Sequence, residues 1–367
     1  FKKKIQFYFK KFFQLVFLLI YGNIKYCKDA ITSNNIIKRK IENIVPDIKD
    51  YKSYFSYKIK NGRVYTDYVE HVAIIDGNTL VNEASYQQIS GELKDAKENI
   101  VLTKGTPRLK KRIKGRVLSL VQGASGNKNY AHWLLDILPK IKLCTEHYPL
   151  EEIDFFYTPV LQNFQKKTLA ILNIDEDRII NSDINRHIFA SELIVVDHPW
   201  YHKGFVHNQY EFLPSWIIYW LRDVYLKHAK NFDNNEKIYI DRTDSKFKHC
   251  QIQNDEEVFG FLKERGFSKY KVGELSFFEQ IYLFNNAKII IGAHGAAFTN
   301  LAFCKSDTNI IEIKPVSHPN NQYKRISQIN NLNYSLIQTK EIDENQKKFG
   351  DTYLPIKKLK HCIKSFD

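Results

Sequence analysis

The apolar and polar positions of the chain follow two different periods. Between residues 63 and 90 apolar and polar residues alternate, and Val, Tyr and Ile are frequent. This alternation predicts short antiparallel strands with a turn at residues 76–78. From residue 116 onward, short apolar runs alternate with segments of helical period, which predicts a mainly parallel sheet. In the first part of this region we expect strands at 117–122, 153–158 and 187–197, and helices at 129–148 and 161–172.

The alternation is most regular between residues 237 and 313. We expect strands at 237–241, 269–274, 288–293 and 309–313, and helices at 255–265, 277–286 and 296–304. Strands joined by helices of this length predict a doubly wound domain. Because 367 residues are too many for one ordinary core, we predict two domains. The fold is α/β, with two Rossmann-like domains that face each other across a ligand-binding cleft, and a β-rich N-terminal extension.

The predicted parts are a basic segment at 1–40, α/β domains at 41–205 and 206–345, and a tail at 346–367. The formal net charge is +14, and residues 1–40 hold ten Lys or Arg and one acid, or +9. The other 327 residues therefore carry only +5, the difference between these two values. A nucleic-acid partner is not expected, because the basic excess lies beside an apolar run rather than over the body of the protein.

The N-terminal apolar run, residues 12–24, has 13 uncharged residues, fewer than the ~20 that a spanning helix needs. Lysines beside aromatic and aliphatic residues suit a helix that lies in a membrane surface. We therefore expect residues 1–26 to bind a membrane and the protein to be peripheral at its cytoplasmic face. The lumen of the secretory pathway is the alternative location. A truncated signal anchor and a plain packed helix are the alternative interpretations of the segment.

Candidate metal ligands are few. The five cysteines are an odd number without a C-x-x-C pair, which argues against a zinc site or a disulfide framework. Asp175, Glu176 and Asp177 form a D-x-D pattern, but it follows a predicted helix rather than a strand. We interpret it as an acidic surface turn and predict no metal site.

The clearest candidate site is the run GAHGAAFTN at 292–300, which follows an apolar strand and opens a helix. In a parallel sheet this point is the carboxyl edge, where ligands bind. Small residues let a ligand approach the backbone, and the amides at a helix start favour phosphate. We predict ligand contacts from Gly292, Gly295, Ala296 and Asn300. His294 can donate a hydrogen bond to a diphosphate or stabilise leaving-group charge; the alternative is a tight turn with a structural histidine.

Charged residues lie at the ends of two other predicted strands. Glu312, at the end of one, could hold the hydroxyl groups of a ribose, or could face a helix end. Arg242, at the end of another, could reach a phosphate, with Lys246 in the loop behind it. Solvated loop charges are the alternative interpretation of both cations.

A second candidate site is the predicted helix that begins near Asn129. Asn129, His132, Trp133 and Asp136 are spaced so that they share one helical face. Asp136 can orient His132 and raise its basicity, which is what a general base for a hydroxyl group needs. A buried His–Asp pair that only holds the helix is the alternative. Pro139 is expected to end or kink the helix.

These segments resemble glycosyltransferase family 61. The matching pieces are NYAHWLLDILPKI (129–141), YIDR (239–242), 252–267, 276–304 and IIEIKP (310–315). The resemblance implies a two-domain fold of the GT-B type, inverting transfer and no metal requirement. It also implies donor binding through Arg242, His294, Gly295 and Glu312. The family usually has a second arginine shortly before residue 252, where this chain has His249, Cys250 and Gln251.

The sequence therefore predicts a glycosyltransferase with His132, Asp136 and His294 as its catalytic residues. The expected donor is a UDP-linked sugar, bound as substrate without a further cofactor. The expected acceptor is a hydroxyl group of a glycan or glycolipid in surface polysaccharide synthesis. The alternative is a non-catalytic protein of degenerate GT-B fold that binds a nucleotide sugar or a carbohydrate.

Overall fold

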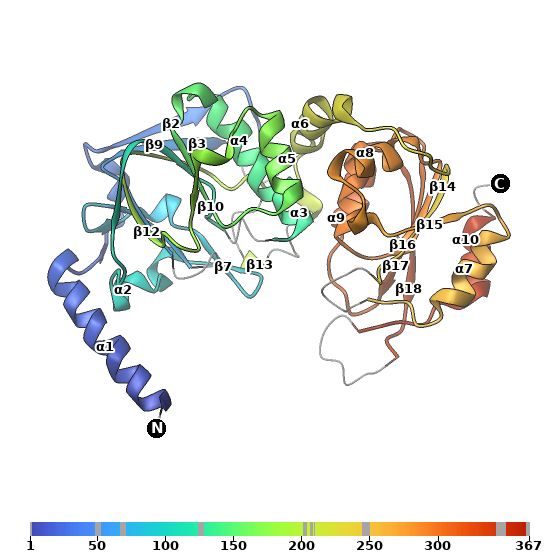
Figure 1. Ribbon diagram of the computed structural model, residues 1–367, viewed down its shortest axis with the longest axis horizontal. Coiled ribbons are helices and arrows are strands. Elements are labelled where there is room, and N and C mark those ends of the chain that lie inside the picture. Colours follow the sequence, from blue (N-terminus) through green and yellow to red (C-terminus); the bar gives the residue numbers. More distant parts are fainter. Residues whose placement is uncertain are drawn as a thin grey trace. The chain divides into compact units, whose positions relative to one another are not determined.

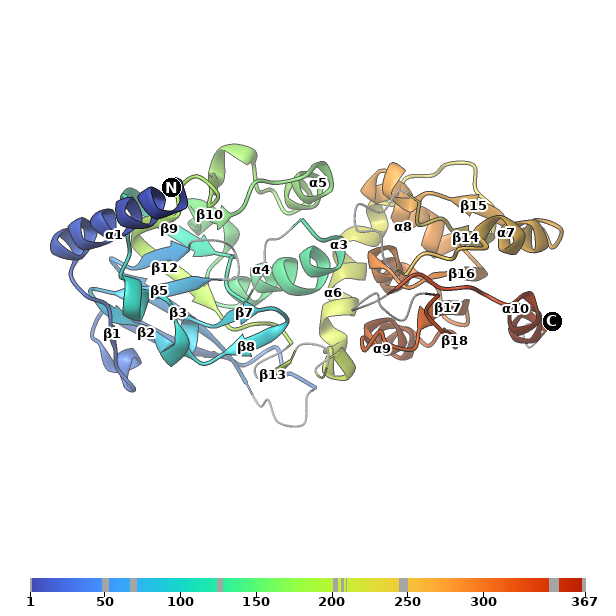
Figure 2. The ribbon, with the colours of Figure 1, turned by 90° about the horizontal axis from the view of Figure 1, so that it is seen from below.

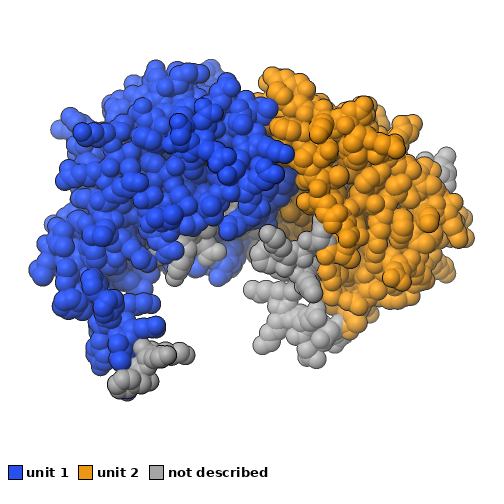
Figure 3. All heavy atoms as spheres, viewed as in Figure 1, with its two compact units in different colours: residues 1–209 blue, residues 210–367 orange. Residues whose placement is uncertain are grey.

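The computed structural model describes residues 2–47, 53–66, 71–123, 128–200, 204–205, 208, 210–243, 250–342 and 350–364. The chain forms two compact units, Phe1–Gln209 and Tyr210–Asp367, which are coloured blue and orange in Figure 3. Each is described by itself below. No described helix combines the length and the apolar character needed to cross a membrane.

Unit 1 is built on a ten-stranded mixed sheet (Figures 1 and 2). β12 pairs in parallel with β9, and β9, β10 and β11 follow in parallel order. On its other edge β12 pairs antiparallel with β3 and β4. The strands are β1 Lys25–Tyr26, β2 Ile36–Ile41, β3 Tyr54–Lys60, β4 Arg63–Thr66, β5 Val72–Asp76, β6 Thr79–Leu80, β9 Lys111–Ser119, β10 Phe155–Thr158, β11 Ile179–Asn181 and β12 His187–Val196.

A small antiparallel sheet and several helices complete unit 1. The small sheet joins β7 Gln87–Ile89, β8 Glu92–Lys94 and β13 Gly204–Phe205. Helix α1 Lys2–Tyr21 comes first in the chain, and α2 Val101–Lys104 precedes β9. The β9–β10 connection contains α3 Tyr130–His132, the π-helical turn η4 Trp133–Ile137 and α4 Leu138–Thr145, and α5 Asn163–Ile171 leads toward β11.

The helical segment after β9 does not end at Pro139, although an end there is one of the two outcomes predicted for that position. Asn129 Oδ1 accepts hydrogen bonds from the amides of Ala131 (2.9 Å) and His132 (3.3 Å) and so caps the helix. The helix then continues through Pro139 to Thr145. A π-helical turn changes the hydrogen-bond register directly before Pro139, which has no amide to donate.

Unit 2 is a doubly wound domain with a parallel sheet in the order β15-β14-β16-β17-β18. Helices α7 and α10 lie on one face of this sheet, and α8 and α9 lie on the other (Figure 1). The elements are α6 Ser215–Tyr225, β14 Lys237–Ile240, α7 Asp255–Lys263, β15 Ser268–Tyr270, α8 Phe277–Asn286, β16 Ile289–Ala293, the 3-10 helix η11 Ala296–Phe303, β17 Asn309–Pro315, α9 Gln322–Ile329, β18 Asn333–Thr339 and α10 Ile356–Ile363.

The fold is mixed α/β with several sheets, one of them parallel throughout. The predicted doubly wound domain is confirmed in unit 2, with β18 as a fifth strand that the sequence did not predict. The strand predicted at 269–274 is shorter, because a 3-10 turn takes its second half, Val272–Glu274. Unit 1 has a parallel part but extends it with antiparallel strands.

Candidate functional site

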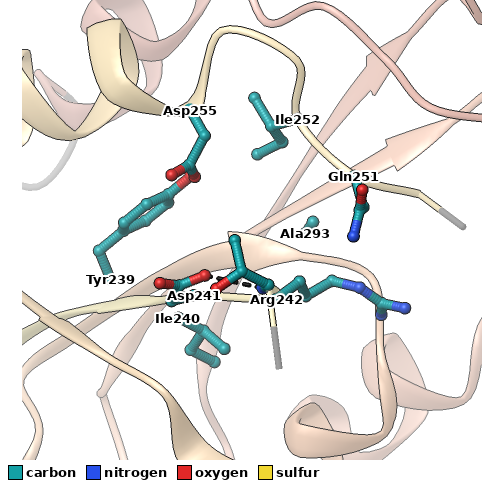
Figure 4. A pocket seen from close by; sticks show the side chains of 9 residues that line it. Tyr239, Ile240, Asp241, Arg242, Gln251, Ile252, Asp255 and Ala293 are labelled. Atoms are coloured by element: carbon teal, nitrogen blue, oxygen red, sulfur yellow. Dashed lines mark hydrogen bonds between the residues drawn. The ribbon is translucent and has the colours of Figure 1, made fainter. Parts of the chain in front are cut away.

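The carboxyl ends of β14 and β16 form the topological switch point of unit 2. The two strands are neighbours, but α7 follows β14 on one face of the sheet while η11 follows β16 on the other. In doubly wound sheets ligands bind at such a point. A small pocket lies here (Figure 4), lined by Tyr239, Ile240, Asp241, Arg242, Thr243, Gln251, Ile252, Asp255 and Ala293.

Arg242 brings a positive charge to this point. Its guanidinium extends away from Asp241 and Tyr239 (Figure 4), and its Nη1 donates a hydrogen bond to the carbonyl oxygen of His294. The guanidinium lies so close to Gly295 that a Cβ on that glycine would be 1.8 Å from Nη1. Only a residue without a side chain therefore allows this contact between the cation and the start of η11.

The amides at the start of η11 lie next to this cation. The first hydrogen bond of the helix runs from the amide of Phe298 to the carbonyl of Gly295, at 3.0 Å. The amides of Ala296 and Ala297 stand ahead of it, as is usual at a helix start. Backbone amides beside a guanidinium are a suitable environment for a phosphate group.

His294 is held by a buried carboxylate. Its Nδ1 pairs with Glu312 Oε1, and the other oxygen, Oε2, accepts a hydrogen bond from the Tyr334 hydroxyl. His294 and Glu312 are 4% and 1% exposed. Burial raises the pKa of Tyr334, and the charge of Glu312 raises it further. Both oxygens of Glu312 therefore have protein partners, and Nε2 is the nitrogen of His294 that can face a ligand.

Sequence reasoning missed three residues around His294. The His318 ring lies 3.9 Å from the His294 ring, centroid to centroid, and the Tyr323 ring lies at 4.9 Å. Lys314 Nζ donates to the carbonyl of Asn320 (2.6 Å) and holds the loop after β17. Lys314 follows Glu312 by two positions in a strand, and this spacing, which places both on one face, could have identified it.

In unit 1, His132 and Asp136 form the predicted pair. His132 Nδ1 lies 2.7 Å from Asp136 Oδ2, and Trp200 Nε1 donates to Asp136 Oδ1 at 2.6 Å. Asp136 is fully buried, whereas the His132 side chain is 24% exposed. Burial would lower the pKa of His132, but the charge and hydrogen bond of Asp136 outweigh it, so the pKa is raised. This is an oriented, basic imidazole.

A buried lysine one turn beyond Asp136 is the main feature that sequence reasoning missed in unit 1. Lys140 is 0% exposed, and its Nζ donates to the Gln122 carbonyl at 2.5 Å. Burial lowers its pKa to about 7, although the charge of Asp136 opposes the shift. His198 is also buried, and its pKa is lowered by burial and by the charges of Lys140 and His132. The spacing 132–136–140 is the signal that could have indicated Lys140.

Comparison with protein-family models identifies the family of the domain that holds these residues. The family model described as Glycosyltransferase 61 matches residues 130–311. The chain carries a glycosyltransferase 61 domain. Membership of this family implies glycosyltransferase activity, with binding of a sugar donor and an acceptor. A search of curated proteins found none that matches the chain. The matched range contains His132, Asp136, Arg242 and His294, and Glu312 follows it directly.

Two of the predicted donor contacts have structural roles in this glycosyltransferase 61 domain. A Cβ on Gly292 would lie 2.8 Å from Ile240 Cβ, so this glycine permits close packing of β16 on β14. Asn300 is completely buried, and its amide donates to Gln280 Oε1 (3.0 Å) and the Ala297 carbonyl (3.1 Å). We therefore leave both out of the proposed donor-binding set, while Lys246 lies outside the described residues.

The position of the expected second arginine carries no described cation. Cys250 is completely buried there, with a positive φ of 57°, and burial raises the pKa of its thiol to about 12. Gln251 pairs with Asp351 through its amide, at 3.0 Å. This stretch therefore holds the loop before α7 to the C-terminal segment.

The D-x-D sequence of the glycosyltransferase 61 domain lies in an exposed 3-10 turn, where Glu176 pairs with Lys166 at 2.6 Å. The prediction of an acidic surface turn is confirmed. Within the described ranges, no cluster of three or more His, Cys, Asp or Glu is arranged to hold a metal ion.

Proposed function

We propose that this protein transfers a sugar from a nucleotide diphosphate sugar, with UDP as the nucleotide, to a hydroxyl group of a glycan or glycolipid. The transfer inverts the configuration of the anomeric carbon. The negative charge of the diphosphate is neutralised by cationic side chains of the protein rather than by a metal ion. The single observation that carries the proposal is the contact of Arg242 with Gly295 at the switch point of unit 2. We also propose that the two units form a GT-B fold and that the protein acts in surface polysaccharide synthesis.

On the donor side, the diphosphate lies against the amides of Gly295 and Ala296. Arg242 neutralises it through charge-assisted hydrogen bonds. His294 donates from Nε2 to the leaving diphosphate, and the contact of its Nδ1 with Glu312 orients the ring for this. Because both of its oxygens are engaged, Glu312 is a positioning residue for His294 and does not hold the ribose.

On the acceptor side, His132 is the base and Asp136 orients it. His132 removes the proton of the acceptor hydroxyl through Nε2, since Nδ1 is occupied by Asp136. The hydroxyl oxygen then forms a bond to the anomeric carbon from the face opposite the diphosphate. The bond from that carbon to the diphosphate oxygen breaks, and the diphosphate leaves with the electron pair.

Lys140 is a positioning residue for the base. A buried lysine whose pKa is depressed lowers the stability of the fold at neutral pH, so a role in packing alone does not explain it. It interacts electrostatically with Asp136 from one turn beyond, and its hydrogen bond fixes the segment after β9 at Gln122. We propose that it holds Asp136 in place.

Two measurements on the full chain test the assignment: UDP affinity by calorimetry, and transfer or hydrolysis of UDP-sugars. Arg242→Gln should weaken UDP binding about ten- to hundredfold, the effect of losing a charged hydrogen bond. Asp136→Asn should lower the rate about 10²- to 10⁴-fold with UDP affinity unchanged. The exposed residues Arg265 and Asp223 provide the matched controls Arg265→Gln and Asp223→Asn. Wild-type behaviour of either site variant would overturn its assignment.

A non-catalytic binding protein is the second candidate, because the position of the expected second arginine holds the buried Cys250. This candidate predicts that UDP binds and that Arg242→Gln weakens it, while no UDP-sugar is turned over. Release of UDP from a UDP-sugar by the wild-type protein excludes it.

A further inference from the structure

Helix α1 packs on unit 1 through one side only. Gln14 Nε2 donates to the Thr103 carbonyl at 3.3 Å, and the Leu18 side chain covers Gly105, where a Cβ would lie 2.6 Å from Leu18 Cδ2. The Tyr21 ring meets the His187 ring edge-on at 5.3 Å. Positions 14, 18 and 21 share one helical face. In Figure 1 the helix runs from this contact to its N-terminal end, which stands apart from the remainder of unit 1.

The opposite side of α1 is apolar and exposed. A helix on the surface of a globular protein normally turns its apolar stripe toward the core and its charges toward water. In α1 the apolar stripe also faces water, together with the exposed Lys4, Lys10 and Lys11. The spacing of seven exposed apolar residues places them on one stripe. They are Ile5 (54% exposed), Tyr8 (68%), Phe9 (62%), Phe12 (61%), Leu15 (62%), Leu19 (89%) and Ile20 (61%). Phe13 (39%) lies at the edge of the stripe, and Phe7 (55%) is exposed on the other side of the helix.

The charges around this stripe are of one sign. Helix α1 contains five lysines and no acid. The segment on which its carboxyl end lies, residues 104–114, adds six Lys or Arg without an acid. Within that segment Leu109 is 81% exposed, and Lys110 donates its amide to the Tyr21 hydroxyl at 3.2 Å. The charged residues of α1 and of the segment that its packed side contacts are therefore all basic.

We propose that this stripe docks unit 1 onto a membrane surface that carries anionic lipids. The aromatic and aliphatic side chains enter the interface between headgroups and acyl chains, and the lysines bind the anionic headgroups. A second copy of the helix is the less favourable cover, because it would bring five more lysines to the same stripe with no acid in α1 to pair with them. The inference does not rest on the proposed transfer reaction.

Cosedimentation of the full chain with lipid vesicles tests the proposal. Wild-type protein should bind phosphatidylglycerol-containing vesicles about tenfold or more better than pure phosphatidylcholine vesicles, with the difference reduced by salt. The double variant Phe12→Ser/Leu15→Ser should lose about tenfold or more of this binding. Ile184→Ser is the control, since Ile184 is an apolar residue of unit 1 outside α1 that is even more exposed (78%).

Thermal unfolding and UDP affinity should not differ between these variants and the wild-type protein, because the changed side chains are exposed. Equal vesicle binding by the double variant and the wild type would overturn the proposal. So would failure of the wild type to bind anionic vesicles. Dimerisation in solution that the double variant abolishes, without vesicle binding by the wild type, would show that a second copy covers the stripe instead.

Discussion

Gly295→Ala is the sharpest test of the donor site, because it changes one methyl group at the contact with Arg242. The added Cβ would lie 1.8 Å from Arg242 Nη1 and 2.9 Å from Cζ, whereas ordinary contact begins near 3.4 Å. The guanidinium must therefore move by at least about 1.6 Å, the difference between 3.4 and 1.8 Å. The backbone itself accepts alanine, because φ at Gly295 is 177°, which is extended.

The variant should lose the binding free energy of one charge-assisted hydrogen bond between Arg242 and the diphosphate. Such a bond contributes about 1.5–3 kcal/mol, so UDP affinity should fall roughly ten- to hundredfold. The stability of unit 2 should change little, because the displaced atoms are the far end of a flexible side chain. Calorimetric titration with UDP and a thermal unfolding curve measure the two quantities separately.

Two further variants make the test decisive. In an Arg242→Gln background the clash no longer exists, so Gly295→Ala should add less than about 0.5 kcal/mol to the loss of binding free energy. Gly260→Ala is the matched control: it lies in α7 with no atom near its Cβ, and it should leave UDP affinity unchanged. Wild-type affinity of Gly295→Ala, or an equal loss with and without Arg242, would refute the reasoning.

Three other changes have defined outcomes. Lys140→Met should lower the transfer rate yet stabilise the fold at pH 7 by roughly 3 kcal/mol in urea unfolding. The fall of the lysine pKa from 10.5 to about 7 on folding costs about 4 kcal/mol at pH 7, and loss of the hydrogen bond to the Gln122 carbonyl offsets about 1 kcal/mol of the gain. This gain should shrink as pH rises toward ~10.5, the pKa of an unfolded lysine; a loss of stability at pH 7 would contradict it. Tyr334→Phe leaves one oxygen of Glu312 without its donor, and should lower kcat with little change in UDP affinity; unchanged kcat would argue against the positioning role. Burial lowers the pKa of His187 to about 3. Below pH ~6.5 this histidine is therefore protonated in the unfolded chain but stays neutral in the folded protein. The free energy of unfolding should fall by about 2 kcal/mol from pH 7 to pH 5 as a result. Urea unfolding of His187→Gln should show that much less pH dependence, and an unchanged slope would contradict the assignment.

The strands of unit 2 could be predicted because a parallel sheet is covered by helices on both faces. Its inner strands therefore read as uninterrupted apolar runs, such as Ile289–Ala293 in β16, and the small residues after that run mark the turn to η11. β18 escaped prediction because Asn333–Thr339 is an edge strand that is mixed in polarity and has only two buried residues. Its Tyr334 then supplied the partner of Glu312 that the sequence did not indicate.

Spacing along one helix was enough to pair His132 with Asp136, because residues four apart lie one above the other. The partners on the remaining sides came from elsewhere in the chain. Trp200 reaches Asp136 across 64 positions, and Lys140 reaches back to the carbonyl of Gln122. No periodicity relates such positions, since they meet only when the sheet brings β9 and β12 side by side.

The amphipathic character of α1 and the ligand-binding edge of unit 2 are local properties, and they can be read from neighbours within one turn or one strand. Which side of α1 turns toward the protein is not local: its contacts at Gly105 and His187 place the apolar stripe outward. The same holds for Glu312, which the sequence put at a strand end free to bind a ribose, and which packing committed to His294 and Tyr334. Local spacing determines which interactions a residue is able to make, whereas packing between distant segments determines which partner it contacts.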